Sequence, residues 1–388
     1  MSAPRGSPLS LRRYHRWPGR RPAGEGTEPN LGHIHRTGYR IQPEHRLGDV
    51  VGGDRIIGAE TTYPRGTLVD VAVAVGHHRD DAGDADFVVI YGAPGTGKSS
   101  FAAGFPRPWF LRVDPKGTQS LPRSVAKSNV PVSWDELPGK RFDPQRPSIM
   151  GLLRVILDSE TPPGTLVLDT VNKAEALLFE YLCKLGQVDS IEAYDGGYGH
   201  GFTKSTEMMH KLIQLLHQIN GRGVTIIAVS HAGSIKVPNP SGAQFEQWGM
   251  SIVKKSGDLW MGDASTVIFA QPEGQIETKD AGKKSEKSKI RYTGRTLAHV
   301  VPGQGWFAKN RDCLPSPMVL DADVFAEEAR IGQALKEQYY SLRGGLSPAR
   351  RAEIGERMAV AGWSRENMLE VIAELTNNNA TENKEQAT

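Results

Sequence analysis

The sequence contains few cysteines and no long apolar segment, and each scarcity excludes a class of protein. Its two cysteines, Cys183 and Cys313, stand far apart, so they provide neither a zinc-binding spacing nor a disulfide framework. No stretch approaches the roughly 18 consecutive apolar residues of a membrane-spanning helix. The arginine-rich start lacks the apolar segment of a secretory signal. We therefore expect a protein of the reducing cytoplasm that has no membrane partner.

Branched aliphatic residues are also scarce in the first 46 residues. This segment holds nine arginines and three glutamates, which gives it a charge of +6 when the whole chain is +3. Such a segment buries little apolar surface, so we expect residues 1–46 to be a disordered basic extension. The extension is either an arm that touches nucleic acid or an inert tail. Residues 47–85 are an uncertain peripheral segment, whose alternating run at 67–75 is typical of a strand.

A glycine-rich segment provides the strongest functional signal in the chain. It reads GAPGTGKS and lies between the apolar run 87–91, typical of a buried strand, and residues 100–103, which can begin a helix. This order of strand, loop and helix is that of a P-loop, whose backbone N–H groups surround phosphates. The predicted nucleotide-binding residues are Gly92, Ala93, Pro94, Gly95, Thr96, Gly97, Lys98, Ser99 and Ser100. Lys98 can reach the β- and γ-phosphates and the Ser99 hydroxyl can ligate Mg²⁺, so ATP and Mg²⁺ are the expected cofactors.

From residue 86 onward, segments typical of strands and helices alternate, which predicts an α/β fold with a mostly parallel central sheet. The expected strands lie at 108–113, 165–169, 224–229 and 266–270, and the expected helices lie at 147–157, 174–185 and before Asn220. A charged insert at 272–291 follows, and then a hairpin that joins 296–301 to 306–309. The P-loop core is therefore expected to span residues 86–320.

The chain after the core is polar and helical in pattern. Ser347 and Ser364 precede segments typical of helices, and Gly362 between them is typical of a helix end. We expect a small helical appendix at 321–376 and a disordered polar tail at 377–388.

Hydrolysis of a nucleotide needs an acid that organises the metal, a group that positions water, and stabilisation of transition-state charge. Asp169, at the end of a buried strand, is the predicted acid of the Mg²⁺ shell. Asp114 is the candidate that polarises water, although its sequence context is also an ordinary turn. His231 follows another buried strand, where it either senses the γ-phosphate or is a structural histidine. Lys309 and Arg311 share one side of an extended segment, and are either fingers for a neighbouring subunit's nucleotide or solvated cations.

Five segments carry a resemblance to a known family, in the order GAPGTGKSS, TLVLDT, YGHG, VTIIAVSH and WFAKNRDCLP. In this order they resemble phage-encoded RecA-like P-loop ATPases of single-strand annealing and recombination. The resemblance covers about residues 86–320, and the late AKNR followed by LP is its most diagnostic part. It implies a RecA-like ATPase core that is stimulated by single-stranded DNA and forms a ring or filament in the bacterial host cytoplasm. It also implies that Lys309 and Arg311 act in trans and that His231 senses the γ-phosphate.

The same resemblance puts the loops at 187–202 and 232–260 against DNA. Its candidates for phosphate contact are Lys204, Lys236, Lys254 and Lys255, and its candidates for stacking on bases are Tyr198, Phe245 and Trp248. Relatives usually carry a glutamate soon after the second strand, where this chain has Asp114 followed by a proline. Either Asp114 replaces that glutamate or the water-positioning group is missing. The alternative functions are a hexameric helicase or helicase loader on the same fold, and a nucleotide-dependent DNA-binding scaffold with little hydrolysis.

Overall fold

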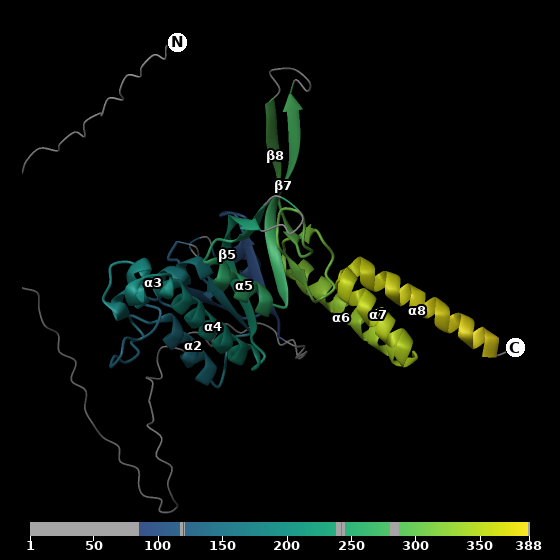
Figure 1. Cartoon of the computed structure of the whole chain (residues 1–388), viewed down its shortest axis with the longest axis horizontal. Helices are drawn as coiled ribbons and strands as arrows, with labels where there is room; N and C mark the ends of the chain where they lie inside the picture. Colours follow the sequence, from purple (N-terminus) through teal and green to yellow (C-terminus); the bar gives the residue numbers. More distant parts are fainter. Residues whose placement is uncertain are drawn as a thin grey trace, which may run out of the picture. The chain divides into compact units, whose positions relative to one another are not determined.

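The computed structural model describes residues 85–386, apart from 117–118, 120, 238–241, 243–244 and 280–286 (Figure 1). The expectations for residues 1–46 and for nearly all of 47–85 lie outside this part of the chain. The strands are β1 (Phe87–Gly92), β2 (Pro108–Arg112), β3 (Ala126–Lys127), β4 (Thr165–Asp169), β5 (Thr225–Val237), β6 (Phe245–Met250), β7 (Thr266–Lys279), β8 (Lys287–His299), β9 (Lys309–Asn310) and β10 (Met318–Val319). The helices are α1 (Lys98–Ala103), α2 (Ile149–Asp158), α3 (Val171–Gly186), the 3-10 helix η2 (Ile191–Gly196), α4 (His200–Asn220), α5 (Lys254–Asp263), α6 (Ala322–Gly344), α7 (Pro348–Ala361) and α8 (Arg365–Gln386).

A mixed sheet forms the centre of the fold, in the order β10-β8-β7-β1-β5-β4-β2-β3. Every pairing from β7 to β3 is parallel, whereas β8 pairs antiparallel with both β7 and β10. This arrangement confirms the predicted α/β fold with a mostly parallel sheet. The strand order also puts β5 between β1 and β4, so the ends of these three strands meet at one edge of the sheet, where ligands bind in open α/β folds.

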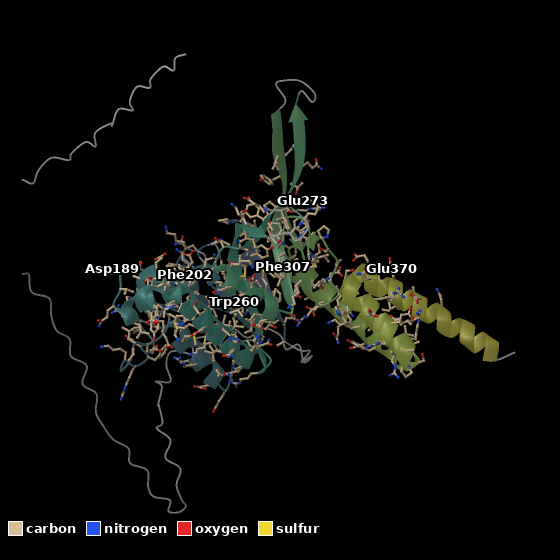
Figure 2. All side chains as sticks on the ribbon, in the orientation of Figure 1. Asp189, Phe202, Trp260, Glu273, Phe307 and Glu370 are labelled. Atoms are coloured by element: carbon tan, nitrogen blue, oxygen red, sulfur yellow. The ribbon has the colours of Figure 1, made fainter. Side chains whose placement is uncertain are left out.

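Both faces of the sheet are covered by helices, which explains why the central strands are apolar throughout. Residues of one strand point alternately to opposite faces. In β1, Val89 and Tyr91 face a large core that includes residues of α2, α3, α4 and α5, among them the fully buried Trp260 (Figure 2). Val88 and Ile90 face a second core, which includes residues of α1 and the start of α6.

The strand that begins at Thr266 is longer than predicted. The expected pairing of 296–301 with 306–309 is wrong, although Gly303 and Trp306 do form an isolated antiparallel bridge at the predicted turn. β7 continues to Lys279 and pairs with β8 over almost its whole length, so residues 296–299 belong to β8. Residues 309–310 form β9, which pairs with the start of β7 instead. β-branched and aromatic residues do recur through 276–293, but the lysines and glutamates between them weaken the apolar alternation that signals a strand.

The C-terminal appendix forms three helices around a small core of its own. Tyr339 of α6, Ile354 and Met358 of α7 and Leu375 of α8 are buried in that core. The predicted helix starts are confirmed, because Ser347 accepts a hydrogen bond from the Arg350 N–H and Ser364 accepts one from the Asn367 N–H.

α8 continues through Gln386, which corrects the disordered tail expected from residue 377. The physical reason is cooperativity, since a helix that is already nucleated and packed extends into polar sequence at little cost. Although α6 and α8 each exceed 20 residues, no helix in the described part of the chain has the length and apolar character needed to span a bilayer.

Candidate nucleotide site

The P-loop lies between the end of β1 and the start of α1, as its sequence predicts. Gly95 and Gly97 have φ values of 81° and 80°, a backbone region that glycine adopts without strain. At Gly92, an added Cβ would lie 2.4 Å from the carbonyl oxygen of Ala270 on the neighbouring strand β7. The glycines therefore allow both the tight turn of the loop and its close contact with the sheet.

The Lys98 side chain is folded back into its own loop and is buried. Its Nζ atom lies 3.0 Å from the Gly92 carbonyl, 2.7 Å from the Ala93 carbonyl and 3.2 Å from the Thr96 hydroxyl. Three acceptors match the three donors of an ammonium group. Burial nevertheless lowers the pKa of Lys98 to about 8, while the Asp169 carboxylate opposes that shift. The loop thus holds a cation that a phosphate can draw outward.

Ser99 and Asp169 come together at the head of α1, as the sequence predicts for a Mg²⁺ site. The Ser99 hydroxyl donates a hydrogen bond of 2.8 Å to Asp169 Oδ2, although the two residues are 70 positions apart. Burial raises the pKa of the Asp169 carboxyl, and the hydrogen bond from Ser99 counteracts this. A hydroxyl and a carboxylate are hard oxygen ligands, which suit a Mg²⁺ ion that also binds water and phosphate oxygens.

His231 lies beside the P-loop because β5 is the strand next to β1. In the register of the two strands, His231 is paired with Gly92. Its pKa is lowered by burial and by the nearby Lys98 ammonium, which favours a neutral ring. Within the described residues, its buried Nδ1 atom has no hydrogen-bond partner. A ring nitrogen without a partner at this position is suited to contact a bound phosphate.

Asp114 is brought to the same site, next to Asp169. Its backbone N–H donates a hydrogen bond of 3.0 Å to the Asp169 carbonyl, and its negative charge contributes to the raised pKa of Asp169. Its Oδ1 atom accepts a hydrogen bond of 2.9 Å from the Lys116 N–H, which is the turn geometry that its sequence also allows. The residue therefore forms a turn and lies beside Asp169, and its role toward water stays a prediction.

Two residues of the site were missed in the sequence analysis. Asn172, in the first turn of α3, accepts hydrogen bonds from the His231 N–H at 2.8 Å and the Ser230 hydroxyl at 3.1 Å, and donates one of 2.7 Å to the Ser251 carbonyl. The signal available in the sequence was its place three residues after Asp169. Asn172 therefore ties the helix that follows Asp169 to both ends of the β5–β6 hairpin.

The second missed residue is Tyr91, the last side chain before the P-loop glycine. Its buried hydroxyl lies 3.1 Å from the Trp248 carbonyl on β6 and 2.5 Å from the Phe307 carbonyl. In sequence this tyrosine is one of five apolar strand residues, so only the structure shows its partners. It joins the P-loop strand to the β5–β6 hairpin and to the segment that precedes Lys309.

Lys309 and Arg311 do not lie at the nucleotide site of their own chain. β9 pairs with the first residues of β7, and Thr266 is itself paired with Val88 near the start of β1. Lys309 and Arg311 therefore lie at the start of the parallel strands, whereas the P-loop lies at their carboxyl ends. Lys309 Nζ donates hydrogen bonds to the Met261 and Gly262 carbonyls near the end of α5, an ordinary role for a cation at that position, and Arg311 is exposed.

The candidate DNA contacts fall into two groups. Tyr198 is 99% exposed in a glycine-rich loop, and Lys236 and Trp248 are exposed on the β5–β6 hairpin together with Phe245. By contrast, two of the lysines are held in ion pairs along their own helices. Lys204 pairs with Glu207 at 2.9 Å, and Lys254 pairs with Asp258 at 2.7 Å, whereas Lys255 is exposed.

A cavity of about 440 Å³ opens beside the P-loop. Thr96, Gly97 and Ser100 line one side of it, and Arg295 of β8 and the start of α6 line the other. The cavity is therefore continuous with the loop that would hold the phosphates, and the predicted nucleotide-binding residues Thr96, Gly97 and Ser100 belong to its wall.

A family model described as an AAA domain matches residues 86–312, which is more than half of the chain. The chain belongs to this family. The AAA domain is a P-loop NTPase domain. The chain is similar at 13% identity to the solved structures of flagellar accessory protein FlaH from Methanocaldococcus jannaschii and of a KaiC-like protein from Pyrococcus horikoshii OT3. The first match covers 60% of this chain and 88% of FlaH with a TM-score of 0.27, and the second covers 58% and 88% with a TM-score of 0.25. No curated protein matches the chain.

Proposed function

We propose that this AAA domain protein is a Mg²⁺-dependent ATPase that grips single-stranded DNA in its ATP state during phage-type recombination or repair. The observation that carries the proposal is the path of β5. His231 on this strand is paired with Gly92 of the P-loop, and the same strand continues to Val237 in the exposed hairpin with β6. A single strand thus joins the phosphate end of the site to the surface that carries the candidate DNA contacts.

The residues of the loop account for nucleotide binding. Phosphate oxygens attract the Lys98 ammonium more strongly than neutral carbonyls do, so ATP draws this side chain out of its loop. The nucleoside occupies the cavity between Thr96 and Arg295. Ser99 and Asp169 hold Mg²⁺, which neutralises charge on the phosphates when it is bound.

Two residues act on the terminal phosphate in this proposal. Asp114, beside Asp169, accepts a hydrogen bond from the attacking water. His231 contacts the γ-phosphate through a ring nitrogen that has no partner in the described chain. When the γ-phosphate leaves, that contact is lost, and the change reaches the β5–β6 hairpin through β5 and through the hydrogen bonds of Asn172.

The proposal also requires more than one subunit. Lys309 and Arg311 lie at the sheet edge opposite their own P-loop, so any contact they make with a nucleotide is with that of a neighbouring copy. There they would neutralise transition-state charge, as arginine fingers do. A ring or a filament provides such a neighbour for every subunit.

Steady-state ATP turnover, measured with and without single-stranded DNA, tests the proposal. We expect DNA to raise the turnover of the wild-type protein. Asp169→Asn should keep nucleotide affinity and lose turnover, because the amide cannot balance the charge of the metal. Lys236→Ala, on the hairpin, should reduce stimulation by DNA. Absence of turnover in both conditions, with nucleotide still bound, would disprove the ATPase.

Mixed oligomers test the role of neighbouring subunits. Lys98→Ala weakens nucleotide binding and removes turnover in a subunit, and Arg311→Ala removes the finger but leaves the P-loop. In a mixture, an Arg311→Ala subunit can receive Arg311 from a Lys98→Ala neighbour, so activity should return. No recovery at any mixing ratio would contradict action in trans.

A second function is favoured by one observation at Asp114. Its Oδ1 atom already accepts the Lys116 N–H, and a glutamate with longer reach is missing at this position. A protein that binds ATP and DNA but barely hydrolyses ATP follows from this geometry. Asp114→Glu distinguishes the two functions, since it should raise turnover severalfold only if the water-positioning group is what the chain lacks.

A further inference from the structure

Residues 309–314 are held on one side by the sheet and on the other by the C-terminal appendix. We propose that the appendix positions Arg311 for the nucleotide of a neighbouring subunit, and that it does so through the ion pair between Lys336 and Asp312. The inference rests on the proposed function, because it names the residues that place the finger assigned there. Lys336 is a positioning residue, since it contacts Asp312 and acts on the nucleotide only through Arg311.

Asp312, the residue after Arg311, connects the sheet with the appendix. Its Oδ2 atom accepts a hydrogen bond of 2.5 Å from the hydroxyl of Thr266, the first residue of β7. Its Oδ1 atom accepts one of 3.3 Å from the Nζ atom of Lys336 on α6. The Lys336 and Asp312 side chains are 21% and 17% exposed, so salt and water screen this ion pair less than a pair on the surface. One carboxylate thus fixes the strand and the helix to each other.

Lys336 has no competing acid along its own helix. Ion pairs within a helix join residues that are three or four positions apart. No acidic residue stands at either distance on either side of Lys336. Arg330, on the same helix, does pair locally, with Glu327 at 2.7 Å. The sequence of α6 therefore directs the Lys336 ammonium to Asp312.

The backbone of the two residues after Arg311 is packed against the same appendix. A Cβ added at Gly332 of α6 would lie 1.8 Å from the Asp312 carbonyl oxygen, so the helix can approach this closely only at a glycine. Cys313 is fully buried, together with residues of α6, α7 and α8, in the appendix core. Its carbonyl accepts a hydrogen bond of 3.0 Å from Nε of Arg365, the first residue of α8. A displacement of α6 or α8 would therefore move the chain that carries Arg311.

The turn that presents Arg311 is closed by the side chain of Asn310. The Asn310 Nδ2 atom donates a hydrogen bond of 2.8 Å to the Leu314 carbonyl, and its Oδ1 atom accepts one of 3.0 Å from the Leu314 N–H. Leu314 is itself fully buried, in the core that includes residues of α1 and the start of α6. Arg311 is exposed within this closed turn. The segment thus holds the backbone of Arg311 in place and leaves its side chain in solvent, where another subunit can approach it.

The accuracy with which a finger is placed decides how much it contributes. An arginine finger is worth about 10³ to 10⁵ in turnover. A displacement of about 1 Å at a group that acts on the reacting atoms can cost about 10². Without the Lys336 ammonium, Asp312 keeps its hydrogen bond with Thr266, so Arg311 is displaced and not removed. We therefore expect loss of this ammonium to lower turnover less than loss of Arg311 does.

Steady-state ATP turnover of full-length Lys336→Met, measured with single-stranded DNA, tests the proposal. Methionine keeps an apolar stem and a good helix former but removes the ammonium. Both kcat and kcat/KM should fall about 10- to 100-fold, and the Kd for ATP should stay within about twofold of the wild type, because the lost effect belongs to the transition state. Lys336→Arg keeps the cation and should restore most of the turnover. Arg330→Met is the matched control, since it removes an exposed ion pair from the same helix and should keep wild-type turnover.

Mixed oligomers show whether Lys336 acts through the finger of its own subunit. A Lys336→Met subunit keeps its P-loop, so it should regain turnover when Lys98→Ala neighbours supply a correctly placed Arg311. It should regain none in a mixture with Arg311→Ala subunits, because neither kind of subunit then supplies a well-placed finger. A substitution that only destabilised the fold or the subunit's own nucleotide site would not give this pattern.

The outcomes separate this inference from the proposed function. If Arg311→Ala keeps wild-type turnover, or is not rescued by Lys98→Ala subunits, the finger itself is disproved and the inference falls with it. If Arg311→Ala behaves as proposed and Lys336→Met keeps wild-type turnover, only the inference is overturned. The inference is also overturned if Lys336→Met loses ATP binding, if Lys98→Ala subunits do not restore its turnover, or if Arg330→Met loses turnover equally.

Discussion

Nucleotide affinity should fall as the pH rises above 8, because Lys98 loses its proton there. Burial lowers the pKa of this lysine from 10.5 to about 8 in the free protein. A bound triphosphate favours the charged ammonium, so the pKa in the complex is higher. Binding therefore takes up a proton at any pH between the two values, and each pH unit in this range costs about 1.4 kcal/mol.

The size of the effect follows from these values. Between pH 7.5 and 9.5 the dissociation constant should rise about 25-fold, because the protonated fraction of Lys98 falls by that factor while the complex stays protonated. At pH 9, about 0.9 proton should be taken up for each nucleotide bound. His231 does not interfere, since its pKa is lowered from 6.5 and its ring is neutral throughout this window.

Isothermal titration calorimetry in two buffers of different ionisation enthalpy measures both the affinity and the proton uptake. Lys98→Met is the control, because it removes the titrating group and should give weak but pH-independent binding. A wild-type affinity that stays constant from pH 7.5 to 9.5 would refute the reasoning. So would an equal pH dependence in Lys98→Met, since another group would then be responsible.

Three further predictions follow from buried polar groups. Tyr91→Phe keeps the ring but leaves the carbonyls of Trp248 and Phe307 without their donor. The free energy of unfolding, measured in urea, should therefore fall by about 1–3 kcal/mol. An unchanged value would contradict the role of the hydroxyl. Burial raises the pKa of Glu175 from 4.5 to about 7, so the folded state holds an extra proton between these values and loses stability as the pH rises through them. Glu175→Gln should therefore be more stable than the wild type at pH 8 by about 1–3 kcal/mol and equal to it near pH 4.5, and parallel pH profiles would exclude this. Asn172→Ala should bind ATP normally and lose most of the stimulation by DNA, and a normal ratio of stimulated to basal turnover would show that the β5–β6 hairpin responds by another path.

The hydrogen bonds of Tyr91 and Asn172 give the site a mechanical connection to the candidate DNA surface. Tyr91 precedes the P-loop and Asn172 follows Asp169, yet both contact the β5–β6 hairpin or its continuation. Glu175 adds a third contact, because its carboxylate accepts the Val253 N–H just before α5 at 3.0 Å. In the proposed function, a change at the phosphates reaches the hairpin through these three sets of hydrogen bonds.

The sequence by itself determined the P-loop, the central strands and the pairing of Ser99 with Asp169. These are readable because they depend on local features, such as glycines where φ is positive, a continuous apolar run for a strand buried on both faces, and an acid at the strand's end. The helix starts at Ser347 and Ser364 belong to the same class, since a capping hydroxyl contacts an N–H only three residues away.

Only the tertiary structure decided which strands and side chains that are distant in the sequence become neighbours. That β5 runs between β1 and β4, and so brings His231 to the P-loop, depends on pairings between segments more than 50 residues apart. The same holds for Lys309, which β9 carries to the far edge of the sheet, and for Tyr91, whose hydroxyl partners are 157 and 216 residues away. Neither local propensity nor apolar period specifies such neighbours, because they are chosen by the packing of the whole sheet and its helices.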